Sequence, residues 1–175
     1  WFFKWLYNLL HNWLFITVGN DVLVPQVHWL ILFIPVLGGC LVGLITHFLI
    51  RTEKLHGTAA IMKSVALSGG RLHYSQTPVK TLAAILSIGS GASVGPEDPS
   101  VQIGASLGSM LGQIFHVSED RLRTLVAAGA ASAIAAAFNA PIAGVFFALE
   151  IILGEISGSA VGMILVAGVT SSVFT

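Results

Sequence analysis

Three long stretches without a formal charge limit what this chain can fold into more than any other feature. Residues 29–50, 124–149 and 156–175 contain no Asp, Glu, Lys or Arg. At a rise of about 1.5 Å per residue, each stretch can cross the roughly 30 Å hydrocarbon core of a bilayer as a helix. Because backbone in lipid must satisfy its hydrogen bonds internally, the sequence predicts an all-α polytopic membrane protein.

The composition indicates the same class. Of the 175 residues, 55% are hydrophobic and 9% are charged, whereas soluble domains carry roughly 25% charged residues. The formal net charge is zero, without a basic face that would attract nucleic acid. The single cysteine excludes an internal disulfide, and the histidines lack metal-ligand spacing. No nucleophile–base arrangement is evident, so we expect an integral membrane protein that is not an enzyme and has no metal or cofactor.

Several segments predict how the helices are divided. Residues 81–94 and 101–115 are short apolar stretches separated by Gly and Pro, a pattern typical of broken helices that line a transport site. Residues 127–138 read AAGAASAIAAAF, and such small side chains allow close helix approach in lipid. Asn139 before Pro141 predicts a helix boundary, and Ser118 before two acids predicts a capped helix start.

An acidic pair stands at the centre of the apolar half. Glu97 and Asp98 are the only formally charged residues in the range 81–118, and they lie between Pro96 and Pro99. Proline and acidic residues are both favoured in the first turn of a helix, so the segment predicts a helix start. The free N–H groups of such a start also bind anions. A carboxylate there can occupy the anion's position, and can leave it by rotating or by taking up a proton.

Two interpretations of the pair compete. In a soluble protein an acid at a helix start is usually a plain cap, whereas inside a membrane an ionisable residue is a functional-site hypothesis by default. Asp98 is the better candidate for the cap and Glu97 for the moving group, although spacing alone leaves both assignments open. The glycines of residues 89–95 do not favour a nucleotide loop, because no Lys-Ser/Thr follows them and no strands alternate with helices.

Two blocks of the sequence resemble signatures of the CLC family of chloride channels and proton-coupled chloride exchangers. GPEDP at residues 95–99, followed by SVQIGASLG, is similar to the family's Gly-Lys/Arg-Glu-Gly-Pro block and the helix that follows it. AAFNAPIAGVFFALE at residues 136–150 is similar to the family's Asn-Ala-Pro segment. The resemblance implies an inverted-repeat architecture of broken and tilted helices that works as a homodimer. It also implies that residues 1–175 are the N-terminal part of a transport domain, with the second repeat absent.

The same resemblance implies the site residues. Glu97 matches the gating glutamate, whose side chain competes with chloride and carries protons. LHGTAAI at residues 55–61 is the counterpart of the family's Gly-Ser-Gly-Ile-Pro anion contact, with His56 where the serine stands. Ile151 stands where exchangers commonly carry an internal proton-transfer glutamate. The anion-binding residues expected in this way are Gly95, Pro96, Glu97, Asp98, Pro99, His56, Gly57 and Thr58.

The expected function is transmembrane transport of chloride or a similar small anion, as a gated channel or as an anion/proton exchanger. The implied partners are the anion, protons, the lipid bilayer and a second copy of the chain. The competing interpretation is a truncated membrane fragment that dimerises through small-residue helices and transports nothing.

Overall fold

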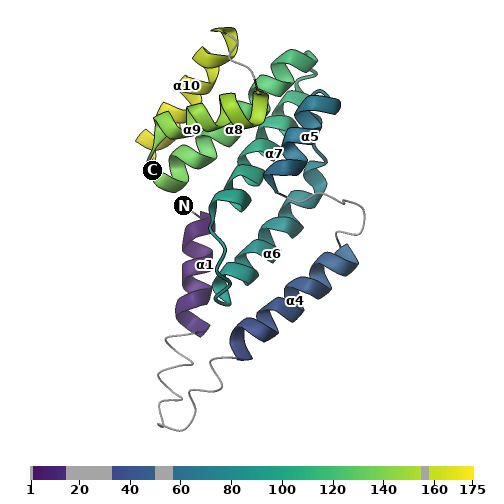
Figure 1. Cartoon of the computed structure of the whole chain (residues 1–175), viewed down its shortest axis with the longest axis vertical. Helices are drawn as coiled ribbons and strands as arrows, with labels where there is room; N and C mark the ends of the chain where they lie inside the picture. Colours follow the sequence, from purple (N-terminus) through teal and green to yellow (C-terminus); the bar gives the residue numbers. More distant parts are fainter. Residues whose placement is uncertain (1, 15–32, 50–56, 155–157) are drawn as a thin grey trace. The chain divides into compact units, whose positions relative to one another are not determined.

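The structure, a computed structural model, describes residues 2–14, 33–49, 57–154 and 158–175. Within these ranges all regular secondary structure is helical, which confirms the predicted all-α class (Figure 1). The elements are α1 (Phe2–Asn12), α4 (Phe33–Leu49), α5 (Thr58–Leu67), η2 (Tyr74–Gln76), α6 (Thr77–Gly89), α7 (Glu97–Ile114), α8 (Glu119–Phe138), α9 (Pro141–Phe147), η3 (Ala148–Leu153) and α10 (Gly158–Val173).

The chain forms two compact units. The first comprises Trp1–Thr52 and Pro78–Pro96, and the second comprises Glu53–Thr77 and Glu97–Thr175. In the first unit, α4 packs against the end of α6, since a Cβ added to the buried Gly38 would collide with the Ser90 side chain. α1 also lies at this end of α6, where a Cβ on Gly89 would come 3.0 Å from Cγ of Leu10.

Close contact between α7 and α8 forms the centre of the second unit. A Cβ added to Gly104 would collide with the Gly129 carbonyl oxygen, and a Cβ on Gly129 would collide with that of Gly104. One turn later, Gly108 lies equally close to the Leu125 carbonyl. The close approach predicted from the small side chains is therefore confirmed. Around this contact lie the buried residues Val101, Ala105, Val126, Ala127, Ala130, Ala131 and Ile164.

The uncharged stretch 124–149 is divided between helices, as Asn139 and Pro141 predicted. α8 ends at Phe138, Asn139 takes a left-handed conformation with φ of 53°, and Pro141 begins α9. α9 then lies back along α8 (Figure 1), where a Cβ on Gly144 would be 2.5 Å from the Ala131 carbonyl oxygen. The chain therefore reverses direction at Asn139, and Pro141 suits the start of α9 because it has no N–H that would need a partner there.

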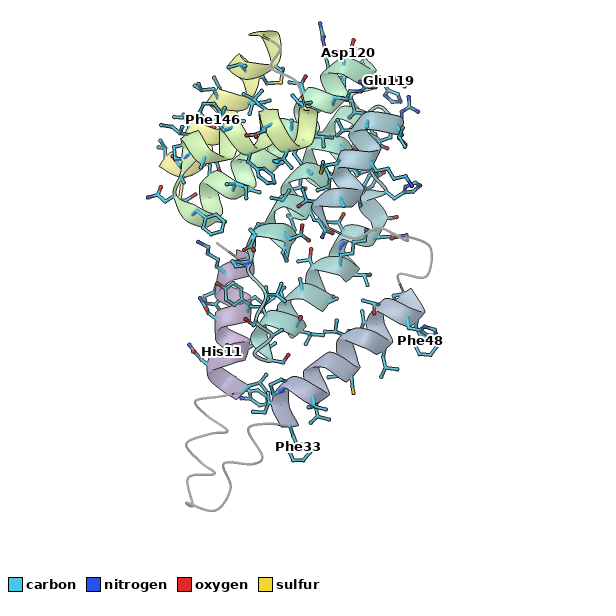
Figure 2. All side chains as sticks on the ribbon, viewed as in Figure 1. His11, Phe33, Phe48, Glu119, Asp120 and Phe146 are labelled. Atoms are coloured by element: carbon cyan, nitrogen blue, oxygen red, sulfur yellow. The ribbon has the colours of Figure 1, made fainter. Side chains whose placement is uncertain are left out.

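The other predicted helix ends are confirmed in part. α6 ends at Gly89 and α7 begins at Glu97, so the Gly/Pro-rich segment between them interrupts the apolar sequence as expected. Ser118 precedes α8 at the predicted cap position, but its hydroxyl makes no capping hydrogen bond. Glu119 and Asp120 occupy the first turn of α8, and Figure 2 shows both at that end of the helix.

Large apolar side chains on the outer helix faces suit a lipid environment. In α4, Phe33 and Phe48 are 58% and 67% exposed and point outward at opposite ends of the helix (Figure 2). Among the described residues, α8 is the one helix long and apolar enough to cross a membrane, and 44% of its apolar window is buried. Four shorter apolar helical segments accompany it, at Phe33–Leu49, Thr58–Leu67, Pro141–Leu153 and Ala160–Val173.

Candidate functional site

The beginnings of α5 and α7 meet in the second unit, although 40 residues separate them in sequence. The backbone N–H of Thr58, the first residue of α5, donates a hydrogen bond of 2.7 Å to Oδ1 of Asp98 in the first turn of α7. The Thr58 hydroxyl donates to the same oxygen at 2.6 Å. The structure thus brings together four of the predicted anion-binding residues, namely Gly57, Thr58, Asp98 and the adjacent Glu97.

A glycine makes room for this contact. Gly57 is buried and precedes α5 with φ of 75° and ψ of −155°, a conformation that other residues rarely adopt. A Cβ at this position would lie 2.8 Å from Oδ1 and 2.9 Å from Cγ of Asp98, and would collide with Oδ2. The Asp98 carboxylate therefore fills the space that the missing side chain leaves.

Asp98 is a cap, but not of the helix to which it belongs. Its Oδ1 caps α5, while its Oδ2 accepts a hydrogen bond of 3.1 Å from Nε2 of Gln102, one turn along α7. The side chain is half-buried, and within the described part of the chain no Lys or Arg forms an ion pair with it. Hydrogen-bond donors and two helix N-termini therefore stabilise its charge.

Glu97 differs from its neighbour in exposure and in hydrogen bonding. It is the first residue of α7, its side chain is exposed, and its carboxylate makes no hydrogen bond or ion pair with a described residue. Of the two adjacent acids at one helix start, one is therefore held by three donors, and the other has no hydrogen-bond partner among the described residues. This contrast is consistent with a movable Glu97, whose gating role stays a prediction.

The remaining predicted residues are placed as follows. Gly95 and Pro96 precede α7, and Pro99 lies in its first turn. His56 lies outside the described residues. Ile151, at the position of the exchangers' internal glutamate, is in the π-helical turn η3 and is 38% exposed. No group of three His, Cys, Asp or Glu side chains suited to a metal is present in the described ranges.

A second polar network, which the sequence analysis missed, fixes the chain that follows α5. The fully buried Ser109 hydroxyl donates to the Gly70 carbonyl at 2.8 Å and accepts from the Leu72 N–H at 2.9 Å. Nε2 of Gln113 donates to the Leu72 carbonyl at 3.1 Å. Ser109 and Gln113 lie four residues apart in a mostly apolar helix, and this spacing could have indicated a polar contact on one helix face. α5 is thereby tied to α7 at its start through Asp98 and beyond its end through Ser109.

The sequence of the chain is similar to the sequences of known proteins. Residues 38–175 match the family described as Voltage gated chloride channel. A ClcB-like protein of Ralstonia nicotianae is 38% identical over 149 residues, which cover 83% of this chain and 35% of the relative. The H(+)/Cl(−) exchange transporter ClcA of Vibrio cholerae is 49% identical over 74 residues, or 42% of this chain and 16% of the relative. This chain thus spans about a third of the first relative's length.

The fold is also similar to a solved structure. The crystal structure of a slow cyanobacterial Cl−/H+ antiporter superposes with a TM-score of 0.77 at 27% identity, over 98% of this chain and 41% of that one. Both the broken helices and the acidic helix start thus occur in a chain whose sequence matches the family over most of its length. The chain belongs to the voltage-gated chloride channel (CLC) family, whose members are integral, multi-pass membrane proteins.

Proposed function

We propose that the protein moves chloride or a similar small anion across a membrane, and that Glu97 is the protonatable plug of the pathway. The observation that carries this proposal is the convergence of the α5 and α7 starts, where Asp98 bonds to the start of α5 and the neighbouring Glu97 side chain is exposed. Helix starts direct partial positive charge toward an anion, so they can replace part of its hydration shell.

The chemistry of such a site suits transport. Helix N-termini bind a partly dehydrated anion without a full buried positive charge, so the anion is held weakly enough to leave again. The charged carboxylate of Glu97 competes with the anion for the same donors. When it takes up a proton it loses that attraction, and the anion can pass. Glu97 therefore links the pathway to pH.

The comparisons support both an anion and protons as substrates. Two of the similar proteins are named as a chloride/proton exchange transporter and a chloride/proton antiporter. The apolar Ile151 cannot relay a proton, so we propose a gated channel or an exchanger that uses another internal route. A homodimer in the bilayer, with one pathway in each subunit, completes the proposal.

The test compares chloride flux from liposomes that contain the full-length protein, between about pH 4.5 and 7.5, a range that brackets carboxylate titration. Glu97→Gln keeps the shape of the side chain but cannot change charge. We expect its flux to match the acid-activated wild type at every pH. Parallel recording of proton flux separates channel from exchange activity.

Two matched variants serve as controls. Asp120→Asn removes another exposed acid from the first turn of a helix, and should leave the pH profile as in the wild type. Asp98→Asn removes the neighbouring charge and should retain a pH response. A wild-type pH profile in Glu97→Gln, or loss of the response only in Asp98→Asn, would contradict the role given to Glu97. Absence of chloride flux in all forms would favour the non-transporting alternative.

A further inference from the structure

We propose that Asp98 acts as a tethered anion that sets how strongly the protein binds the transported anion. Its carboxylate occupies the start of α5, so the protein binds a transported anion more weakly than it would with an uncharged residue at position 98. The inference rests on the proposed function, because it assumes that an anion passes the starts of α5 and α7. The inference about Asp98 concerns how strongly the anion binds, whereas the role proposed for Glu97 concerns how transport depends on pH.

The first support is that the Asp98 carboxylate already accepts hydrogen bonds from the donors at the start of α5. The Thr58 N–H and hydroxyl both point to Oδ1 of Asp98, at 2.7 and 2.6 Å. The next N–H with a described partner, that of Ala60, donates to the Gly57 carbonyl at 3.1 Å. An anion that reached this helix start would have to displace the carboxylate before it could use the two Thr58 donors.

The second support is that the surrounding residues fit the Asp98 carboxylate closely. Gly57, with its positive φ and its missing Cβ, provides the space, and Gln102 holds the second oxygen at 3.1 Å. Three donors from two helices hold a group that is only half-buried and that forms no ion pair within the described residues. The negative charge of a carboxylate at this place repels a second anion beside the proposed pathway.

Together these features predict the effect of neutralisation. Loss of the carboxylate frees the Thr58 donors and removes the repulsion, so the α5 start becomes available to the transported anion. Thr58 would then contact the anion directly through both its N–H and its hydroxyl. With Asp98 present, only the start of α7 is available to the anion. Without its carboxylate, the starts of α5 and α7 can both bind the anion.

The experiment is titration calorimetry of purified full-length protein with chloride. We expect Asp98→Ala to bind chloride about tenfold more tightly, the upper end of what a helix start contributes to anion binding. Asp98→Asn keeps an acceptor oxygen for Thr58 but has no charge, so it should show a smaller gain. Thr58→Val in the Asp98→Ala background should remove part of the gain, because it deletes the hydroxyl that would bind the anion.

The outcomes separate this inference from the proposed function. If the wild type binds chloride and neither variant at position 98 binds it more tightly, the tethered-anion role is wrong while the proposed function stands. If Asp98→Ala does not fold, the gain in the better-capped Asp98→Asn decides the same question. If Thr58→Val leaves the gain of Asp98→Ala intact, the freed hydroxyl does not bind the anion, which contradicts the direct contact inferred for it. If no form binds chloride, both proposals are refuted.

Discussion

Substitution of Gly57 by alanine tests the geometry of the site most directly. Two costs follow from the structure. An alanine with φ of 75° and ψ of −155° is strained by about 1–3 kcal/mol. Its Cβ would also lie 2.9 Å from Cγ of Asp98, so the carboxylate must move and weaken its bonds to Thr58, at about 1.5 kcal/mol for a hydrogen bond to a charged group. We expect the free energy of unfolding to fall by about 2.5–4.5 kcal/mol.

The assay is a denaturant titration of the full-length protein in mixed micelles, followed by circular dichroism. Gly43→Ala is the matched control, because a Cβ on Gly43 within α4 meets no heavy atom within 4 Å. It should stabilise the protein by about 0.5–1 kcal/mol, since alanine is the better helix former. The two Gly→Ala variants should therefore change stability in opposite directions.

A double-mutant cycle separates the two costs. In the Asp98→Gly background the carboxylate is absent, so Gly57→Ala should retain only the backbone strain and cost about 1.5 kcal/mol less than in the wild type. If Gly57→Ala costs the same in both backgrounds, the carboxylate does not occupy the space beside Gly57. If it costs nothing in either, the positive φ itself is wrong.

Two further predictions concern the helix contacts that support the site. Gly104→Ala should destabilise the protein by about 1–3 kcal/mol or more, because its Cβ would collide with the Gly129 backbone. Gly162→Ala in α10 should not destabilise it, because a Cβ there meets no heavy atom within 4 Å. Equal stability of the two variants in the same titration would refute the close crossing of α7 and α8. Ser109→Ala should lower the free energy of unfolding by about 1–3 kcal/mol, because the Gly70 carbonyl and the Leu72 N–H lose their hydrogen bonds to the Ser109 hydroxyl. The amide hydrogen of Leu72 should also exchange faster with solvent. An unchanged exchange rate at Leu72 would contradict the network.

The sequence by itself determined the class of the protein and the places where its helices break. Uncharged apolar stretches indicate helices in lipid because the bilayer offers no other partner for backbone polar groups. The boundary at Asn139 and Pro141, and the interruption between α6 and α7, follow from backbone conformations that Asn, Gly and Pro favour locally. These features depend on neighbouring residues alone, so a single sequence contains them.

Only the tertiary structure decided which of the two adjacent acids is held. Glu97 and Asp98 share one helix turn, and local rules favour either of them at a helix start. What distinguishes them is Thr58, which lies 40 residues before Asp98 and bonds to it where Gly57 leaves room for the carboxylate. A hydrogen bond between residues so far apart depends on how helices pack, and packing depends on many weak contacts at once. Sequence spacing therefore placed the acidic pair, and the fold assigned Asp98 to the start of α5 and left the Glu97 side chain exposed.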